Sequence, residues 1–277
     1  MAFFGCGQFC DRFHRYRGWR VYRYDHMSGA KHSVVAITGG NRGIGRAVAD
    51  LFHSRGWAIG ICSRSPKDHS LPIDLLHCRV DVRHRKDLFR FAAAVQDRFG
   101  GLDVFINSAG ISRWQALEKI DETFSEEVIE TNVLGTLWGC AAAADAMKKG
   151  GVIVNISSLA GKRGSTNNSV YCAAKFAVNG ITQSLAKELG PRGIRVNAVC
   201  PTYVETERIL MALSEPASPA YGQAVETYLS SFASTQTALG RLPTAEEVAE
   251  TVYFLAGPAA SAITGQCLNV DCGTLPQ

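Results

Sequence analysis

Residues 34–45 read Val-Val-Ala-Ile-Thr-Gly-Gly-Asn-Arg-Gly-Ile-Gly, and this stretch decides the fold. Its apolar, β-branched start over Val34–Thr38 predicts a strand, and a helical pattern follows the glycines. Gly39 permits a tight turn, Gly43 lets the backbone approach a pyrophosphate, and Gly45 lets helix and strand pack closely. The helix N-terminus then offers free N–H groups and a partial positive charge to phosphates. The stretch predicts a phosphate-binding loop, with a purely structural glycine-rich turn as the alternative.

Outward from this loop, the chain alternates short apolar runs with longer amphipathic stretches. The helix after the loop is expected over Arg46–His53. The expected strands are Val34–Thr38, Trp57–Ser63, His77–Val82, Asp103–Asn107, Gly151–Ser157, Ile194–Cys200 and Cys267–Val270. Continuous apolar strands joined by helices are typical of a parallel sheet covered on both faces. We expect a doubly wound α/β fold: a seven-stranded parallel sheet with helices on both faces, in one domain over residues 33–277.

Composition and charge exclude several classes of protein. The chain has 277 residues and is 46% hydrophobic, too apolar for a disordered chain. No apolar run approaches the ~20 residues that a membrane-spanning helix needs. Five arginines against two aspartates put +3 of the net +4 on residues 1–26, so the other 251 residues carry only +1. A nearly neutral body lacks the basic face that nucleic acid requires, so neither nucleic acid nor a membrane is expected as a partner.

The nine cysteines are scattered, and none lies in a CxxC pair or in a Cys/His set at zinc spacing. We therefore expect no metal site and no disulfide framework, and a reducing, cytoplasmic location.

Residues 1–26 hold eight aromatic residues and show no clean helical or strand period. They lack the apolar core of a secretory signal and the acid-poor, Ser-rich composition of a mitochondrial presequence. We interpret residues 1–32 as an extension outside the fold, either a disordered tail or an over-extended reading frame with Met27 as the natural start. A membrane-surface anchor or an oligomer arm is the functional alternative.

The end of the second expected strand bears on cofactor choice. A site for NAD would place Asp or Glu there, against the ribose 2′-OH, whereas an arginine accommodates a 2′-phosphate. This chain has Ser63 followed by Arg64, with Arg42 nearby in the glycine loop. Two cations and no carboxylate favour NADP(H), with NAD(H) as the alternative. Asp81 and Val82, at the end of the third expected strand, are placed to contact adenine.

Tyr171 and Lys175 are four residues apart, so on a helix they share one face. An ammonium one turn away favours the phenolate, so we expect Lys175 to lower the tyrosine pKa toward a working range. Ser158 follows a predicted strand, at the sheet edge where ligands bind in such folds, and its hydroxyl can hold a substrate oxygen.

Six motifs in this order resemble those of the short-chain dehydrogenase/reductases, and the likeness runs from about Ser33 to Gly273. They are Thr38-Gly39-x-x-x-Gly43-Ile44-Gly45, Asn107-Ser108-Ala109-Gly110, Asn132, Ser158, Tyr171-x-x-x-Lys175 and Pro201-Thr202-Tyr203-Val204-x-Thr206. The resemblance implies a single-domain Rossmann-like fold and a homotetramer or homodimer. The chain departs from the family pattern at Ser108, at Thr202 and at Cys272, where the family has Asn, Gly and Gly.

The resemblance also implies roles for individual residues. Tyr171 would be the general acid in carbonyl reduction and the base in alcohol oxidation. Lys175 would lower its pKa and bind the nicotinamide ribose, while Ser158 would hold the substrate oxygen. Asn132 would anchor a water of the proton relay, with a purely structural helix-kink residue as the alternative. The cofactor would also contact Asn41, Ile44, Asn107, Ala109, Gly110, Pro201, Val204 and Thr206.

Residues 207–239 form a long segment after the nicotinamide motif, and such a segment is typical of a substrate lid. Helical patterns are expected at Ile209–Leu213 and Val225–Phe232. The candidate substrate walls are Ile209, Leu210, Leu213, Tyr221 and Tyr228, with Trp114 and Tyr203 from other loops.

We expect an enzyme that interconverts a ketone and a secondary alcohol on a small or medium substrate with a nicotinamide cofactor. An enzyme similar to the 3-oxoacyl-[acyl-carrier-protein] reductases is the alternative, although the long lid favours a free substrate over a carrier-bound one. A non-catalytic cofactor-binding scaffold is a remote alternative, because Ser158, Tyr171 and Lys175 are all present.

Overall fold

The computed structural model describes residues 33–148 and 150–276. The expectations for residues 1–32 lie outside the described residues. Within the described ranges, no helix is both long and apolar enough to cross a membrane.

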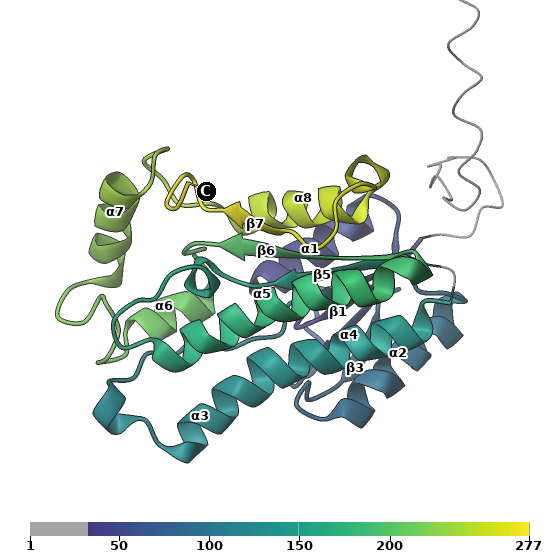
Figure 1. The fold of residues 1–277 in the computed structure, drawn as a ribbon, viewed down its shortest axis with the longest axis horizontal. Coiled ribbons are helices and arrows are strands. Elements are labelled where there is room, and N and C mark those ends of the chain that lie inside the picture. Colours follow the sequence, from purple (N-terminus) through teal and green to yellow (C-terminus); the bar gives the residue numbers. More distant parts are fainter. Residues whose placement is uncertain (1–32, 149, 277) are drawn as a thin grey trace, which may run out of the picture. The chain divides into compact units, whose positions relative to one another are not determined.

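Seven parallel strands form one sheet (Figure 1). They are β1 (Val34–Thr38), β2 (Ala58–Ser63), β3 (Leu76–Arg79), β4 (Val104–Asn107), β5 (Gly151–Ile156), β6 (Ile194–Pro201) and β7 (Cys267–Val270). Their spatial order is β3-β2-β1-β4-β5-β6-β7. The chain reverses its winding direction between β1 and β4, and the crevice outside the strand ends at such a point is where ligands bind. The expected doubly wound α/β fold is therefore confirmed.

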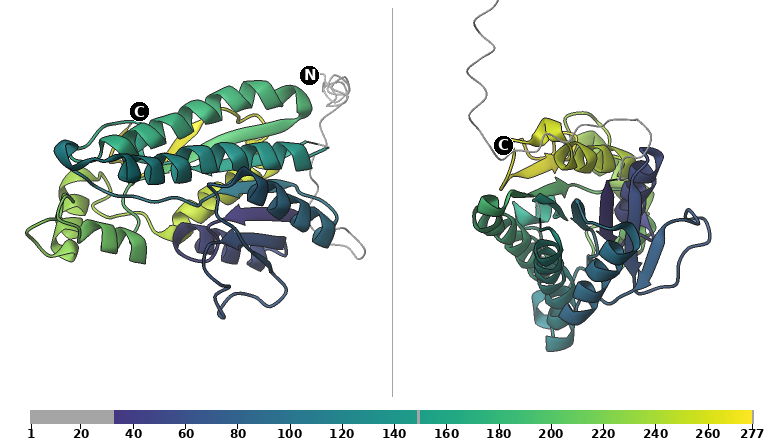
Figure 2. Two further views of the ribbon diagram at one scale, coloured as in Figure 1. Left: turned by 90° about the horizontal axis from the view of Figure 1, so that it is seen from below. Right: turned by 90° about the vertical axis from the view of Figure 1, so that its right-hand side faces the viewer.

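Helices cover both faces of the sheet (Figure 2). On one side α1 (Gly43–Ser54) packs with α8 (Ala245–Ala256) against the sheet. On the other side lie α2 (Arg85–Phe99), α4 (Gly135–Ala146) and α5 (Ser169–Leu189). The remaining helical segments are α3 (Glu122–Ile129), α6 (Glu207–Leu213), α7 (Val225–Gln236), a π-helical segment η2 (Glu130–Leu134) and the 3-10 turns Leu117–Lys119, Leu159–Gly161, Gly190–Arg192 and Pro258–Ala260.

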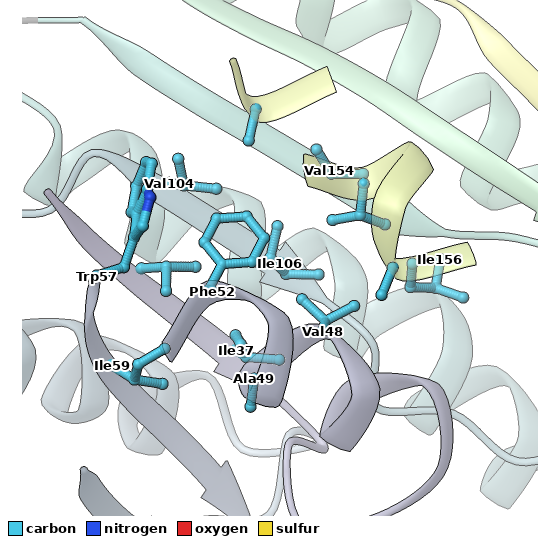
Figure 3. Close-up of a cluster of buried hydrophobic side chains, with 14 of the residues drawn as sticks. Ile37, Val48, Ala49, Phe52, Trp57, Ile59, Val104, Ile106, Val154 and Ile156 are labelled. Carbon is cyan, nitrogen blue, oxygen red and sulfur yellow. The ribbon is translucent and has the colours of Figure 1, made fainter. Parts of the chain in front are cut away.

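The core under α1 and α8 is continuous and apolar (Figure 3). Val48 and Phe52 project from α1 toward the sheet residues Val104 and Ile106, and all four are buried. Phe52 also meets Trp57 edge-to-face, with ring centroids 5.0 Å apart. This packing fixes α1, and with it the glycine loop at its N-terminus, against the sheet.

Some element ends differ from the sequence expectations. Helix α1 begins at Gly43, three residues earlier than expected. The edge strand β3 ends at Arg79 instead of Val82, because its partner β2 ends at the paired Ser63. Asp81 and Val82 therefore follow the strand.

Cys272 has φ of 51°, a left-handed conformation that explains why the family has glycine at this position.

The segment after β6 forms its own small layer beyond the strand ends (Figure 1). Its two helices, α6 and α7, lie at the places where helical patterns were expected. Leu213 and Leu229 of these helices share a hydrophobic cluster with Trp114, separate from the two clusters that flank the sheet.

Candidate active site

A cavity of about 1290 Å³ opens at the carboxyl ends of the strands. Its volume exceeds the ~300–1000 Å³ of pockets for one drug-sized molecule, so it has room for two ligands side by side. The wall includes the expected cofactor residues Gly39, Asn41, Arg42, Gly43, Ile44, Gly45, Ser63, Arg64, Asp81, Val82, Ala109, Gly110, Pro201, Val204 and Thr206. It also includes the expected catalytic and substrate residues Trp114, Asn132, Ser158, Tyr171, Lys175 and Tyr203.

Asn107 is the one expected cofactor residue that the structure does not place on this wall. Its side chain turns into the core, where its Nδ2 donates to Asn155 Oδ1 at 2.9 Å and lies 3.4 Å from the Cys140 sulfur. The Asn107 Oδ1 has no partner among the described residues. It points at Gly139, where a Cβ would lie only 1.9 Å away, so the side chain is confined between β5 and α4.

The glycine loop is shaped to receive a phosphate group. Gly39 has φ of 70°, and a Cβ there would lie 2.9 Å from Ala109 Cα. A Cβ on Gly45 would lie 2.4 Å from the Gly39 carbonyl oxygen. Arg42 precedes α1 without a capping side-chain bond, and the first turn of α1 holds no acidic residue. The uncapped N–H groups and the positive end of the helix dipole therefore fit the pyrophosphate of a dinucleotide.

Asn41 ties the glycine loop to the segment after β2. Its Nδ2 donates to Ser65 Oγ at 3.2 Å and to the Pro66 carbonyl at 3.0 Å. Its Oδ1 accepts from the Asp68 N–H at 2.9 Å. These bonds hold the two loops that would flank the adenosine ribose.

The ribose end of the cavity carries a free cation. Ser63 Oγ bonds to His77 Nε2 at 2.9 Å and to the Ser65 carbonyl at 2.8 Å, so its hydroxyl is already engaged. Asp81 is held by Arg83 at 2.7 Å, and this bond holds the pKa of the carboxyl below its usual range. The exposed Arg64 side chain forms no ion pair with residues 33–148 or 150–276. The described site therefore offers a guanidinium, and no uncommitted carboxylate, to this end of a cofactor.

The tyrosine hydroxyl is surrounded by two serines. The hydroxyls of Ser158, just after β5, and Ser112, after β4, both lie near the Tyr171 hydroxyl, and each acts to lower the Tyr171 pKa because it favours the phenolate. Ser112 was not expected from the sequence. It lies two residues beyond the Asn107–Gly110 motif, so its nearness to Tyr171 depends on how β4 and α5 meet.

Burial dominates the electrostatics of this group. It raises the pKa of Tyr171 to about 12, opposite in direction to the lowering expected from Lys175. The same desolvation lowers the pKa of Lys175 to about 8, because burial disfavours its charged form. The Lys175 ammonium donates to the Ile156 carbonyl at 2.9 Å and lies 5.7 Å from the Tyr171 ring centroid. In this state Tyr171 is protonated at neutral pH.

Asn132 lies fully buried in the π-helical segment η2. Its Nδ2 donates to the carbonyls of Ile111 and Val128, both at 3.0 Å, and its Oδ1 accepts from the Ile111 N–H at 3.2 Å. All three bonds go to the main chain. They fit the structural alternative for Asn132, and they fix the backbone that follows Gly110.

Aromatic residues close the substrate end. Trp114 is 4% exposed, and Tyr203 meets Tyr228 and Phe232 of α7 with ring centroids 5.8 and 4.8 Å apart. The hydroxyls of Tyr203 and Tyr228 are 3.1 Å apart, and burial raises the pKa of Tyr203. Phe232 on this wall was not expected.

The other expected wall residues divide between the cavity and the lid. Ile209 lines the cavity, but Leu210, Leu213 and Tyr221 do not. Leu213 is buried inside the lid cluster, and Tyr221 is 70% exposed. An apolar helix pattern shows which face is buried but not whether that face meets a cavity or another helix.

The loop after β6 fits against the glycine loop. The Thr206 side chain accepts from the Ile209 N–H and so caps α6. A Cβ on Gly43 would contact the Thr206 methyl group at 3.5 Å. The N-terminal end of α6 is thereby placed beside the phosphate loop.

The doubly wound fold, the glycine loop and the Ser-Tyr-Lys group together define an oxidoreductase that uses a nicotinamide cofactor. A family profile described as Enoyl-(Acyl carrier protein) reductase matches residues 38–274. The chain belongs to the short-chain dehydrogenase/reductase family.

Known relatives cover most of the chain. A diacetyl reductase [(S)-acetoin forming] of Staphylococcus aureus is 35% identical over 256 residues, which are 87% of this chain and 97% of the relative. A 3-oxoacyl-[acyl-carrier-protein] reductase of Vibrio cholerae is 32% identical over 247 residues, 87% of this chain and 96% of the relative. Among solved structures, a variant of actinorhodin polyketide ketoreductase with NADPH superposes with a TM-score of 0.82 at 30% identity, over 90% of this chain and 99% of that one.

Proposed function

We propose that this enzyme interconverts a ketone and a secondary alcohol on a small or medium free substrate, with NADP(H) preferred over NAD(H). The observation that carries the proposal is the convergence of the hydroxyls of Ser158 and Ser112 on Tyr171, beside Lys175, in the cavity that the glycine loop borders. The diacetyl reductase relative supports a small carbonyl substrate. Arg64 and the ketoreductase structure with NADPH support the cofactor choice.

In this proposal the bound cofactor supplies the hydride that joins the carbonyl carbon. Tyr171 donates its hydroxyl proton to the carbonyl oxygen in reduction and takes it back in alcohol oxidation. Ser158 holds that oxygen, and Lys175 binds the nicotinamide ribose. The raised pKa of Tyr171, about 12, keeps the hydroxyl protonated at neutral pH, the form from which a general acid donates. Asn132 supports this wall through its main-chain bonds.

Replacing Tyr171 by Phe tests the proposal. The ring keeps its packing but loses the transferable proton, so turnover of ketones with NADPH should fall by about 10²–10⁴-fold. The Kd for NADPH should not change. Tyr221→Phe is the matched control, because Tyr221 is 70% exposed and outside the cavity. Unchanged turnover in Tyr171→Phe would refute the assigned mechanism.

Reduction of a carrier-bound 3-oxoacyl thioester is the second candidate, and the Vibrio cholerae relative favours it. The aromatic wall of Tyr203, Tyr228 and Phe232 over the substrate end favours a compact free substrate instead. Rates with acetoacetyl thioesters and with free ketones separate the two. Efficient turnover of the thioesters alone would establish the second candidate.

The assembly and location expected from the sequence belong to the same proposal. We propose a homotetramer or homodimer, for which light scattering after size exclusion gives the mass. The seven described cysteines are all free, which supports a reducing, cytoplasmic setting.

A further inference from the structure

Arg208 is a cavity residue to which neither the sequence motifs nor the proposed mechanism gives a role. It is the second residue of α6, in the lid, and its side chain is partly buried on the cavity wall. Its Nη1 donates to the Gly110 carbonyl oxygen at 2.7 Å. Gly110 lies just beyond β4, 98 residues earlier in the chain, so this bond joins the lid to the sheet.

The bond crosses the part of the cavity in front of the glycine loop. On one side, the N-terminal end of α6 sits beside that loop, where Thr206 faces Gly43. On the other side, Gly110 follows Ala109, which touches the turn at Gly39. The Arg208 guanidinium therefore lies across the opening to which the uncapped N-terminus of α1 points.

The charges around Arg208 favour an anion. Burial is the largest cause that lowers its pKa, followed by the positive charges of Arg42 and Arg64. Two carboxylates raise the pKa of Arg208, those of Glu127 and Glu207. Glu127 is paired with Arg113 at 3.1 Å, and the exposed Glu207 forms no ion pair with the described residues. Arg42, Arg64 and Arg208 thus share one cavity, and none of the three forms an ion pair with the described residues. Bringing like charges together costs free energy, and a bound polyanion removes that cost.

We propose that Arg208 is a cofactor-clamping residue: on binding, its guanidinium leaves the Gly110 carbonyl for the cofactor pyrophosphate and holds the lid over it. This inference rests on the proposed nicotinamide cofactor. The pyrophosphate is the partner, because Gly110 and Thr206 flank the glycine loop, whereas the 2′-phosphate would lie at Ser63 and Arg64. A guanidinium also matches phosphate oxygens in a bidentate way. The lid is therefore held in place by the group common to NADPH and NADH.

The test measures the Kd of NADPH and of NADH for wild type, Arg208→Ala, Arg208→Lys and Arg64→Ala. Arg208→Ala should weaken both cofactors by the same factor, about tenfold or more, the size of a lost charge-assisted hydrogen bond. Arg208→Lys should retain part of the affinity, because it keeps the charge. Arg90→Ala is the matched control: it removes the same charge from α2, where the side chain is 78% exposed.

Amide hydrogen exchange of the lid gives a second measurement. A contact between Arg208 and the cofactor that did not involve the lid would leave this exchange unchanged. NADPH should slow exchange of the α6 and α7 amides in wild type, and this protection should be lost in Arg208→Ala at saturating NADPH. Equal protection in both proteins would overturn the clamp.

The binding outcomes separate the two proposals. If Arg208→Ala weakens NADPH but not NADH, Arg208 serves the 2′-phosphate and the inference is wrong. If it weakens neither while Arg64→Ala still removes the preference for NADPH, the inference fails and the proposed function stands. If wild type binds neither cofactor, both fail.

Discussion

Replacing Arg64 by Ala should nearly abolish the preference of the enzyme for NADPH over NADH. Arg64 lies at the carboxyl end of β2, exposed on the cavity wall and without an ion pair among the described residues. The neighbouring Ser63 hydroxyl is engaged by His77 and Ser65, and the Asp81 carboxylate by Arg83. Arg64 is therefore the group free to meet a 2′-phosphate.

The size of the effect follows from the exposure of the site. A pair of unit charges 4 Å apart in water contributes about 1 kcal/mol. A phosphate monoester carries about −1.5 to −2 charges, so losing Arg64 should cost about 2 kcal/mol of NADPH binding. Since 1.4 kcal/mol is about tenfold in affinity, NADPH should bind roughly 30-fold more weakly. NADH lacks the 2′-phosphate, so its affinity should stay within about twofold.

Fluorescence titration of wild type and Arg64→Ala with NADPH and NADH, side by side, measures both changes. Repeating the titration at higher salt should shrink the wild-type preference, because exposed charges are screened beyond about 8–10 Å at physiological ionic strength. Two results would refute the reasoning. One is that NADH binds wild type as tightly as NADPH does; the other is that Arg64→Ala weakens both cofactors equally.

Two further predictions concern the lid and helix α8, which packs against the sheet. Trp114→Ala removes a side chain that packs with Leu213 and Leu229 of the lid, at a cost of about 3–5 kcal/mol to that local packing. It should raise KM for the substrate but leave the NADPH Kd near wild type; steady-state kinetics and titration check this, and an unchanged KM would contradict it. Glu247 accepts from Arg241 at 2.7 Å and from the Thr244 N–H, and these bonds lower its pKa from 4.5 to about 2. Because the folded pKa is depressed, the stabilising effect of Glu247 is present above about 4.5 and is lost as pH falls toward about 2. Glu247→Gln should therefore lower Tm at neutral pH, with the gap from wild type closing over that window; a gap independent of pH would disprove the linkage.

The sequence predicts the sheet well because its strands are buried on both faces, which leaves continuous apolar runs. The same signal misplaces the end of β3. Val80 and Val82 are buried beneath α2 and α4, so they extend the apolar run beyond Arg79, the last residue paired with β2, although the Val80 N–H still donates to the Ser63 carbonyl at 3.0 Å. Apolarity reports burial, and strand pairing is a separate property.

The candidate site is predictable where it is local. The glycine loop and the Tyr171–Lys175 pair are each recognised from a few consecutive residues, and both lie on the wall of one cavity. Asn107 was expected to contact the cofactor, but its side chain turns into the core. Successive side chains of a strand face opposite sides, and the sequence alone does not say which side holds the ligand. Ser112 and Arg208 could not be found, since each gains its place from a contact with a distant segment.

The lid helices share a hydrophobic cluster with Trp114, apart from the two clusters that flank the sheet. Substitutions in such a unit add nearly independently to those elsewhere in the protein, because few contacts transmit their effects. Apart from Arg208, which bonds to Gly110 outside the lid, residues of α6 and α7 are therefore free to diverge over generations while selection for folding acts on the sheet and its flanking helices. One scaffold can acquire a new substrate range by drift in this small layer, with its inherited cofactor loop unchanged.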